Sequence, residues 1–230
     1  MLQQLSLELR QFSVCIDTLV PFNNKLVRLL RYEKNNNITR GFGGEHISLL
    51  LDNTMLLGFA RMTRDYRFTD KELFSKSNAY QQAMQFLQQA APDLVTEKPP
   101  CWDNLVKHKF PQALSHELDI HWIDLHSDEI ITIDNSKNCL GGMKVKMRLK
   151  NTSNQWAWVI VNQAGLPCVF ERNICWNMVD KQRETEKWLH DYEKPLSTDS
   201  SNIVMNKTNY NHLISSNLSE SLCDREMLFI

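Results

Sequence analysis

The sequence has no long apolar segment and no leader of the secretory type. A membrane-spanning helix needs roughly 18 or more consecutive apolar residues, and the most apolar window, residues 47–62, is interrupted by Asp52, Asn53 and Arg61. Residues 1–10 lack the basic start and the continuous apolar core of a signal peptide. These absences predict a soluble protein with no membrane partner.

Paired cysteines are also missing. The chain has 6 cysteines, but none form a Cys-x-x-Cys pair or a Cys/His group with zinc-finger spacing. A structural zinc is therefore not expected. A chain of 230 residues, of which 42% are hydrophobic, is large enough for a proper core. We expect reduced and mostly buried thiols, as in a cytoplasmic protein.

Net charge is nearly absent. The chain carries 26 Lys and Arg against 27 Asp and Glu, which gives a formal charge of −1. No overall field therefore draws it to nucleic acid or to an anionic membrane. Acidic residues are missing between Asp134 and Glu171, however, and five cations lie in that interval: Lys137, Lys144, Lys146, Arg148 and Lys150. Any preference for an anionic partner must come from a local patch of this kind.

Familiar catalytic motifs are absent as well. There is no Gly-x-Ser-x-Gly sequence, and the glycine cluster at residues 41–44 matches neither the dinucleotide-binding pattern nor the P-loop pattern. A flexible turn explains this cluster better than a phosphate-binding loop does. The sequence predicts no cofactor and favours a protein that is not an enzyme.

The most regular pattern that is present lies in residues 143–170. Its first eight residues alternate strictly between apolar and basic side chains, which is typical of a strand. Residues 151–154 have turn composition, residues 156–161 are rich in aromatic and β-branched residues, and a second turn at residues 162–165 leads to a third apolar segment. This spacing predicts an antiparallel β-meander, preceded by a strand at residues 129–134 in a strand-rich block that begins at residue 119.

Helical spacing dominates elsewhere. The apolar positions predict helices at residues 2–20 and 22–33, and a further helix at residues 178–192 that packs on the sheet. Residues 69–72 fit a capping box at the start of a helix that ends before Pro92.

Residues 47–62 allow two interpretations. Two apolar strands around a polar turn at residues 52–54 would form a hairpin, whereas a single buried helix with a polar interruption would have the same composition. The hairpin is favoured.

Together these elements predict an α+β protein. It would contain an antiparallel β-meander of four or five strands packed with helices, a helical N-terminal part and a flexible C-terminal tail. The proline-rich composition near residue 98 suggests a mainly helical part at residues 1–98 and a sheet with its flanking helix at residues 99–193, although both could form one domain. Ser, Thr and Asn dominate residues 194–230, which predicts a poorly ordered tail.

The densest group of potential metal ligands lies in residues 116–129, which hold three histidines and five carboxylates. A hydrolytic metal ion would draw its ligands from His116, His121, Asp124, His126 and Asp128. In a strand, however, Asp119 and His121 share one face, while Asp124 and His126 lie on the other. No His-Glu-x-x-His spacing is present. Solvated polar positions around a half-buried strand explain the group better.

A second candidate site is a basic face of the meander. Its members would be Lys144, Lys146, Arg148, Lys150, Trp156 and Trp158. Cations beside aromatic rings hold single-stranded nucleic acid, with phosphates on the cations and bases on the rings. Two ordinary explanations compete with this one. The acidic residues of the preceding strand would pair with the cations across the ladder, and the two tryptophans would belong to the core.

The leading hypothesis from the sequence is a non-enzymatic binding or accessory module that acts on a protein partner through a surface of the sheet. The alternative is a metal-dependent hydrolase that uses the cluster at residues 116–128. A third possibility is nucleic-acid binding through the basic strand at residues 144–150.

Overall fold

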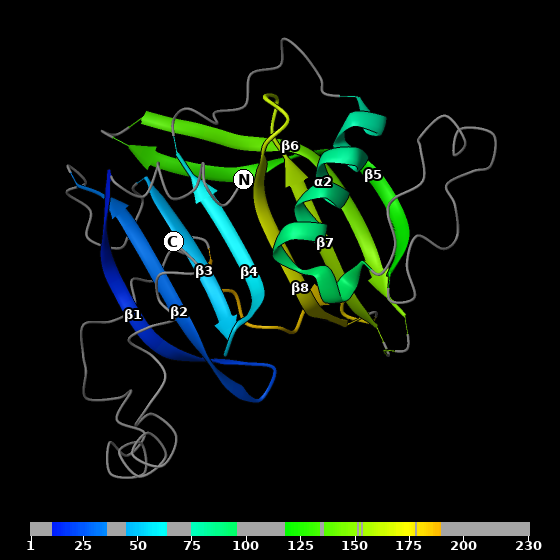
Figure 1. Ribbon diagram of the computed structural model, residues 1–230, viewed down its shortest axis with the longest axis horizontal. Coiled ribbons are helices and arrows are strands. Elements are labelled where there is room, and N and C mark those ends of the chain that lie inside the picture. The colour runs from blue at the N-terminus through cyan, green and yellow to red at the C-terminus, as the bar shows by residue number, and fades with distance from the viewer. Residues whose placement is uncertain are drawn as a thin grey trace. The chain divides into compact units, whose positions relative to one another are not determined.

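The computed structural model describes residues 11–35, 45–63, 75–95, 118–133, 136–150, 152, 154–177 and 179–189, and for residues 127–140 it describes the backbone alone. The helices and strands of these ranges belong to one compact unit, Phe12–Asp191. They form an antiparallel sheet of nine strands with one α-helix (Figure 1). The sheet-dominated fold class is therefore confirmed, whereas the described residues do not show a sheet packed with several helices.

Four strands of the first half follow one another as an antiparallel meander: β1 (Phe12–Phe22), β2 (Lys25–Lys34), β3 (His46–Asp52) and β4 (Met55–Met62). The turns rely on asparagines with positive φ, namely Asn23 at 48°, Asn24 at 65° and Asn53 at 53°. Asparagine tolerates this left-handed conformation, which tight hairpin turns require. The hairpin interpretation of residues 47–62 is therefore correct.

The helical N-terminal part is wrong, because residues 12–33 are strands joined by a turn where the apolar spacing predicted helices. β2 explains the error: Val27 and Leu29 face one side of the sheet, Leu30 faces the other, and all three are buried. A strand that is buried on both faces loses its two-residue alternation, and its apolar positions then imitate helical spacing. Residues 2–10 lie outside the described ranges.

Helix α2 (Lys76–Ala90) confirms the helix that was expected before Pro92. It begins after Ser75, whose hydroxyl oxygen accepts a hydrogen bond of 3.2 Å from the main-chain amide of Asn78 and so caps the helix. The predicted capping box at residues 69–72 lies outside the described residues. In the part of the chain that the structure describes, no helix has the length and apolar character needed to cross a membrane.

The antiparallel meander predicted for the second half is confirmed by four strands: β5 (Leu118–Ile133), β6 (Ser136–Leu149), β7 (Gln155–Val161) and β8 (Pro167–Asn177). Phe59 of β4 pairs with Phe170 of β8, which joins both meanders in the order β1-β2-β3-β4-β8-β7-β6-β5. The short β9 (Gln182–Arg183) also pairs with β8. The sheet thus exceeds the predicted four or five strands because the first half contributes strands instead of helices.

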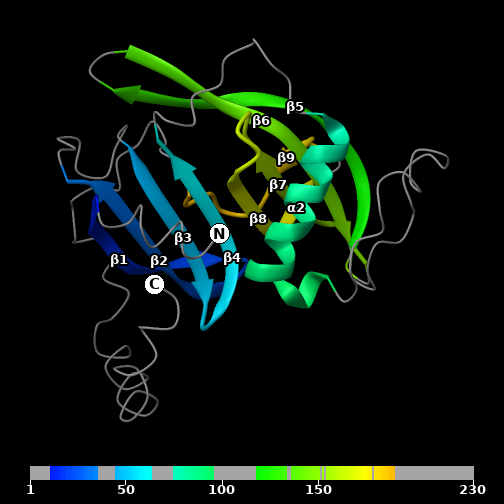
Figure 2. The ribbon, with the colours of Figure 1, turned by 45° about the horizontal axis from the view of Figure 1, so that its top comes forward.

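The sheet has two apolar faces. One face carries α2, which lies across the strands of the second half (Figures 1 and 2). The ring of Phe86 on α2 lies 5.3 Å from that of Phe170, measured between centroids, and Val145 and Met147 of β6 are fully buried. The opposite face holds a second core, to which both meanders contribute: Val20, Phe22, Val27, Leu29, Leu50, Leu57, Ala60, Met62, Trp156, Trp158, Ile160, Cys168, Val169, Ile174 and Leu189.

Residues 182–189 form a segment that we call the clasp, in place of the helix predicted at residues 178–192. The clasp starts as β9, and the amide of Glu184 then donates to the carbonyl oxygen of Cys175 at 3.0 Å. Leu189 at its far end belongs to the second core. The polar side chains of this segment form hydrogen bonds with residues far away in the sequence. Interpreting their spacing as a solvated helix face is therefore wrong. The helix prediction is wrong for the described residues of this segment.

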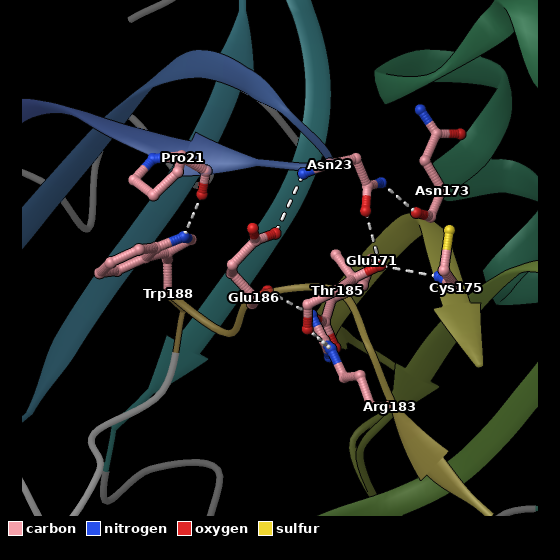
Figure 3. Close-up of polar contacts among 9 residues, drawn as sticks. All are labelled: Pro21, Asn23, Glu171, Asn173, Cys175, Arg183, Thr185, Glu186 and Trp188. Carbon is pink, nitrogen blue, oxygen red and sulfur yellow. Dashed lines mark hydrogen bonds and ion pairs between the residues drawn. The ribbon is translucent and has the colours of Figure 1, made fainter. Parts of the chain in front are cut away.

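Side-chain contacts hold the clasp against the turn between β1 and β2 (Figure 3). Nε1 of Trp188 donates to the carbonyl oxygen of Pro21 at 2.6 Å, and the main-chain amide of Asn23 donates to the carboxylate of Glu186 at 3.0 Å. The hydroxyl of Thr185 donates to the side-chain oxygen of Asn23 at 2.8 Å. These hydrogen bonds connect the β1–β2 hairpin to the clasp, although the bonded residues are separated by 162 to 167 positions in the sequence.

Candidate binding surface

Strands β5 to β8 present cations and indole rings on the sheet face opposite α2. We call this surface the tryptophan–lysine face and define it by Trp122, Lys144, Lys146, Arg148, Trp156, Trp158 and Trp176. The alternation in β6 places its apolar residues toward α2 and its basic residues on this face. Across the ladder to β7, Lys146 lies opposite Trp158, and Arg148 lies opposite Trp156.

Lys146 lies among three indole rings. Its Nζ is 4.3 Å from the ring centroid of Trp156, 5.5 Å from that of Trp176 and 6.0 Å from that of Trp122. Such a cation–π contact contributes about 0.5–1 kcal/mol when exposed and about 2 kcal/mol when desolvated. Burial lowers the pKa of Lys146 from its ordinary value. Indole faces attract the ammonium but offer it no oxygen acceptor, so its lost hydration is only partly replaced.

Trp158 contacts two cations, because Nζ of Lys144 lies 4.2 Å and Cζ of Arg183 lies 5.8 Å from its ring centroid. Trp156 and Trp158 are 9% and 6% exposed, and both belong to the second core. Little of either ring is open for stacking a nucleic-acid base. The described structure thus gives these two tryptophans the core position that was one of the ordinary explanations for them.

The pairing of β5 with β6 brings acidic residues next to the basic strand. Asp119 lies opposite Arg148, and Asp124 lies opposite Lys144. The carboxylate of Asp119 is 3.4 Å from Nζ of Lys150, so this lysine is part of an ion pair. One end of the basic strand is therefore neutralised by Asp119, whereas residues 129–133, which the ladder explanation placed beside the cations, pair with residues 136–140 instead.

Lys146 and Arg148 differ from Lys150 in their ion pairing. Within the described ranges, neither has a carboxylate at ion-pair distance. Lys146 pairs in register with Trp122 instead of an acid, and the Asp124 carboxylate lies 3.8 Å from Nζ of Lys76 at the start of α2. The centre of the tryptophan–lysine face is therefore positively charged.

His121 lies against the same cluster. A β-bulge interrupts β5 at this residue, and its ring approaches that of Trp156 edge to face, with centroids 4.9 Å apart. Partial burial lowers the pKa of His121 most, and the positive charges of Lys146 and Arg148 lower it further. The histidine is therefore mainly neutral at pH 7.

The metal-ligand candidates that the structure describes are not gathered together. His121 lies against an indole ring, Asp124 is exposed and His126 is half-buried farther along the strand. His116 and the side chain of Asp128 lie outside the description. Among the residues whose side chains it covers, no three or more His, Cys, Asp or Glu come close enough to hold a metal ion.

Sequence analysis missed two members of the face, Trp122 and Trp176, and considered His121 only as a metal ligand. Strict alternation places His121 and Trp122 on opposite faces of β5, but the bulge allows both to approach the cluster. Trp176 lies near the end of β8, beyond the third predicted segment. The register of β5 against β6, had it been assigned, would have placed Trp122 opposite Lys146 and so on this face.

The clasp adds a buried ion pair beside this face. A terminal nitrogen of Arg183 lies 2.7 Å from the carboxylate of Glu171, and their side chains are 8% and 6% exposed. Arg183 also donates to the carbonyl oxygens of Thr185 at 2.8 Å and Glu186 at 3.0 Å (Figure 3). The two opposite charges compensate each other, so the positive charge of the face comes from β6.

No family model matches the chain, and neither the curated proteins nor the solved structures contain a significant match to it. Function must therefore be argued from the chemistry of the site.

Proposed function

We propose that this protein is a non-enzymatic binding module whose tryptophan–lysine face binds an acidic segment of a protein partner. The observation that carries the proposal is the ammonium of Lys146, which lies over indole rings with no carboxylate at ion-pair distance among the described residues. Arg148 beside it also has no carboxylate at ion-pair distance in the described ranges, although Asp119 is its partner in register. A cytoplasmic location is a further proposal, and it rests only on the scattered cysteines of the sequence.

A carboxylate is a better partner for Lys146 than its present surroundings. A hydrogen bond to a charged group contributes about 1.5–3 kcal/mol, and it is stronger where water is partly excluded. The half-buried ammonium would keep its contact with Trp156 while it binds the carboxylate. Arg148 is exposed beside it and can take a second acid of the same segment.

A protein segment fits this face better than a nucleic acid does. Binding of single strands depends on bases that stack on open aromatic rings, and Trp156 and Trp158 are largely covered. Acidic side chains need only the cations, and half-buried Trp122 and Trp176 can contact apolar side chains of the same segment.

Charge reversal tests the proposal. Lys146→Glu with Arg148→Glu should weaken binding of a fluorescein-labelled peptide of alternating glutamate and glycine at least tenfold, which is about 1.4 kcal/mol. Fluorescence anisotropy measures the affinity, and the melting temperature checks that the variant is folded.

The matched control is the double reversal Lys25→Glu with Arg28→Glu, which changes the net charge equally at two solvent-accessible positions on β2, a strand separated from β6 by four others in the sheet order. It should retain binding within about twofold. Equal losses in both variants would show attraction by overall charge and contradict the proposal.

A further inference from the structure

Two basic side chains contact one indole ring, and a third is its partner in register. Nζ of Lys146 lies 4.3 Å and the ring centroid of His121 lies 4.9 Å from the centroid of Trp156. Arg148 is the residue directly opposite Trp156 in the β6–β7 ladder. Strands β5, β6 and β7 thus each contribute to this cluster, and neighbouring strands hold its members in fixed register.

The one acid beside the cluster in register is Asp119, whose Oδ1 lies 3.4 Å from Nζ of Lys150. This oxygen is buried and accepts no hydrogen bond in the part of the structure described here, so the carboxylate does not bind Lys146 or Arg148. Nε1 of Trp156 is buried and has no hydrogen-bond partner in the part of the structure described here. A buried donor without an acceptor costs about 1–3 kcal/mol, and such groups in folded proteins call for an explanation.

We infer that His121, Lys146 and Arg148 form a subsite for the phosphoryl group of a phosphorylated residue in the partner segment. This inference rests on the proposed function and specifies its ligand. A phosphoserine or phosphothreonine carries a charge of about −1.5 to −2 and three strong acceptor oxygens. Those oxygens match three separate donors, whereas a carboxylate brings one charge and two oxygens. The fork-shaped guanidinium of Arg148 suits bidentate contact with a phosphate.

Binding of the phosphoryl group should be linked to the protonation of His121. In the free protein, the positive charges of Lys146 and Arg148 on β6 help to hold the pKa of this histidine low, while Trp156 on β7 carries no charge and Asp119 on its own strand is paired. A bound dianion reverses that field and raises the pKa. The histidine therefore contributes proton uptake on binding, and this contribution favours binding as the pH falls, whereas protonation of the phosphate itself, with its second pKa of about 6, opposes it.

Three labelled peptides with identical glutamate and glycine flanks and a central phosphoserine, glutamate or serine test the inference. Anisotropy titration of the wild-type protein should show the phosphoserine peptide binding at least tenfold more tightly than the glutamate peptide. Arg148→Gln and His121→Gln, both at exposed positions, should each reduce that preference to threefold or less. Lys25→Gln, at an exposed position on β2, should leave it unchanged.

Calorimetry in two buffers of different ionisation enthalpy measures the protons taken up by the phosphoserine peptide. The wild type should take up more protons than His121→Gln, in which only the phosphate titrates. Equal affinity for the phosphoserine and glutamate peptides would overturn the phosphoryl subsite and leave the acidic-segment proposal standing. Failure of both acidic peptides to bind would overturn the proposed function itself.

Discussion

Replacing Arg183 by methionine is expected to lower the free energy of unfolding by about 3–5 kcal/mol, because the buried carboxylate of Glu171 loses its ion pair with the guanidinium. The two side chains are 8% and 6% exposed and lie 2.7 Å apart, so water cannot easily replace the lost guanidinium. Arg183 also holds the carbonyl oxygens of Thr185 and Glu186, and the clasp loses these contacts as well.

Urea denaturation measures this loss, and Arg28→Met is its matched control. Arg28 pairs with Asp17 at 2.8 Å, but their side chains are 40% and 48% exposed. An exposed pair contributes about 0–1 kcal/mol. The double variant Glu171→Gln with Arg183→Met should recover part of the stability, because the buried charge is gone. A loss below 1 kcal/mol for Arg183→Met would mean that this pair does not anchor the clasp.

The pattern of burial in β6 and β2 explains why the sequence predicted the first as a strand and the second as a helix. Residues 143–149 of β6 have one apolar face and one basic face, so their alternation is free of errors and the neighbouring strands follow from turn composition. β2 is buried on both sides, as Leu29 and Leu30 show, and its spacing imitates a helix. Local pattern therefore predicted the second half of the sheet and the β3–β4 hairpin correctly, and β1 and β2 wrongly.

The clasp could not be predicted from local pattern at all. Trp188 and Leu189 have the spacing of an amphipathic helix, but their partners are Pro21, 167 positions away, the side chain of His46 on β3 and Gly58 on β4. Contacts over such distances are specified by the assembled sheet, and a single sequence carries no local sign of them.

The candidate surface was predicted in part. Lys146 and Arg148 were placed on one face by alternation alone, and the structure puts both there. The β5–β6 register decides which cations form ion pairs. It brings Asp119 to Lys150 and leaves no described carboxylate at ion-pair distance from Lys146 or Arg148. His121 entered the same surface through a bulge, and a bulge shifts every later residue of a strand relative to strict alternation.

The packing of the clasp on β4 leads to the second large effect, which is expected for Leu189→Ala. This side chain is 2% exposed in the second core, and its truncation should lower the free energy of unfolding by about 2–5 kcal/mol, since a cavity remains where it packed. Gly58→Ala alone should also destabilise, by about 1–3 kcal/mol. A Cβ at residue 58 would lie 2.5 Å from Cδ1 of Leu189, which is closer than two carbons can approach.

Combining Gly58→Ala with Leu189→Ala tests whether the side chain of Leu189 packs against Gly58 of β4. Once the leucine is truncated, the next atom near the added Cβ, apart from those of residue 189, is the carbonyl oxygen of Phe170 at 3.5 Å, an ordinary contact distance. The new methyl group then fills part of the cavity instead of clashing, so the double variant should be at least about 1 kcal/mol more stable than the sum of the single losses predicts. Urea denaturation of all four proteins gives this coupling energy. Additivity within about 0.5 kcal/mol would contradict the contact between β4 and the clasp.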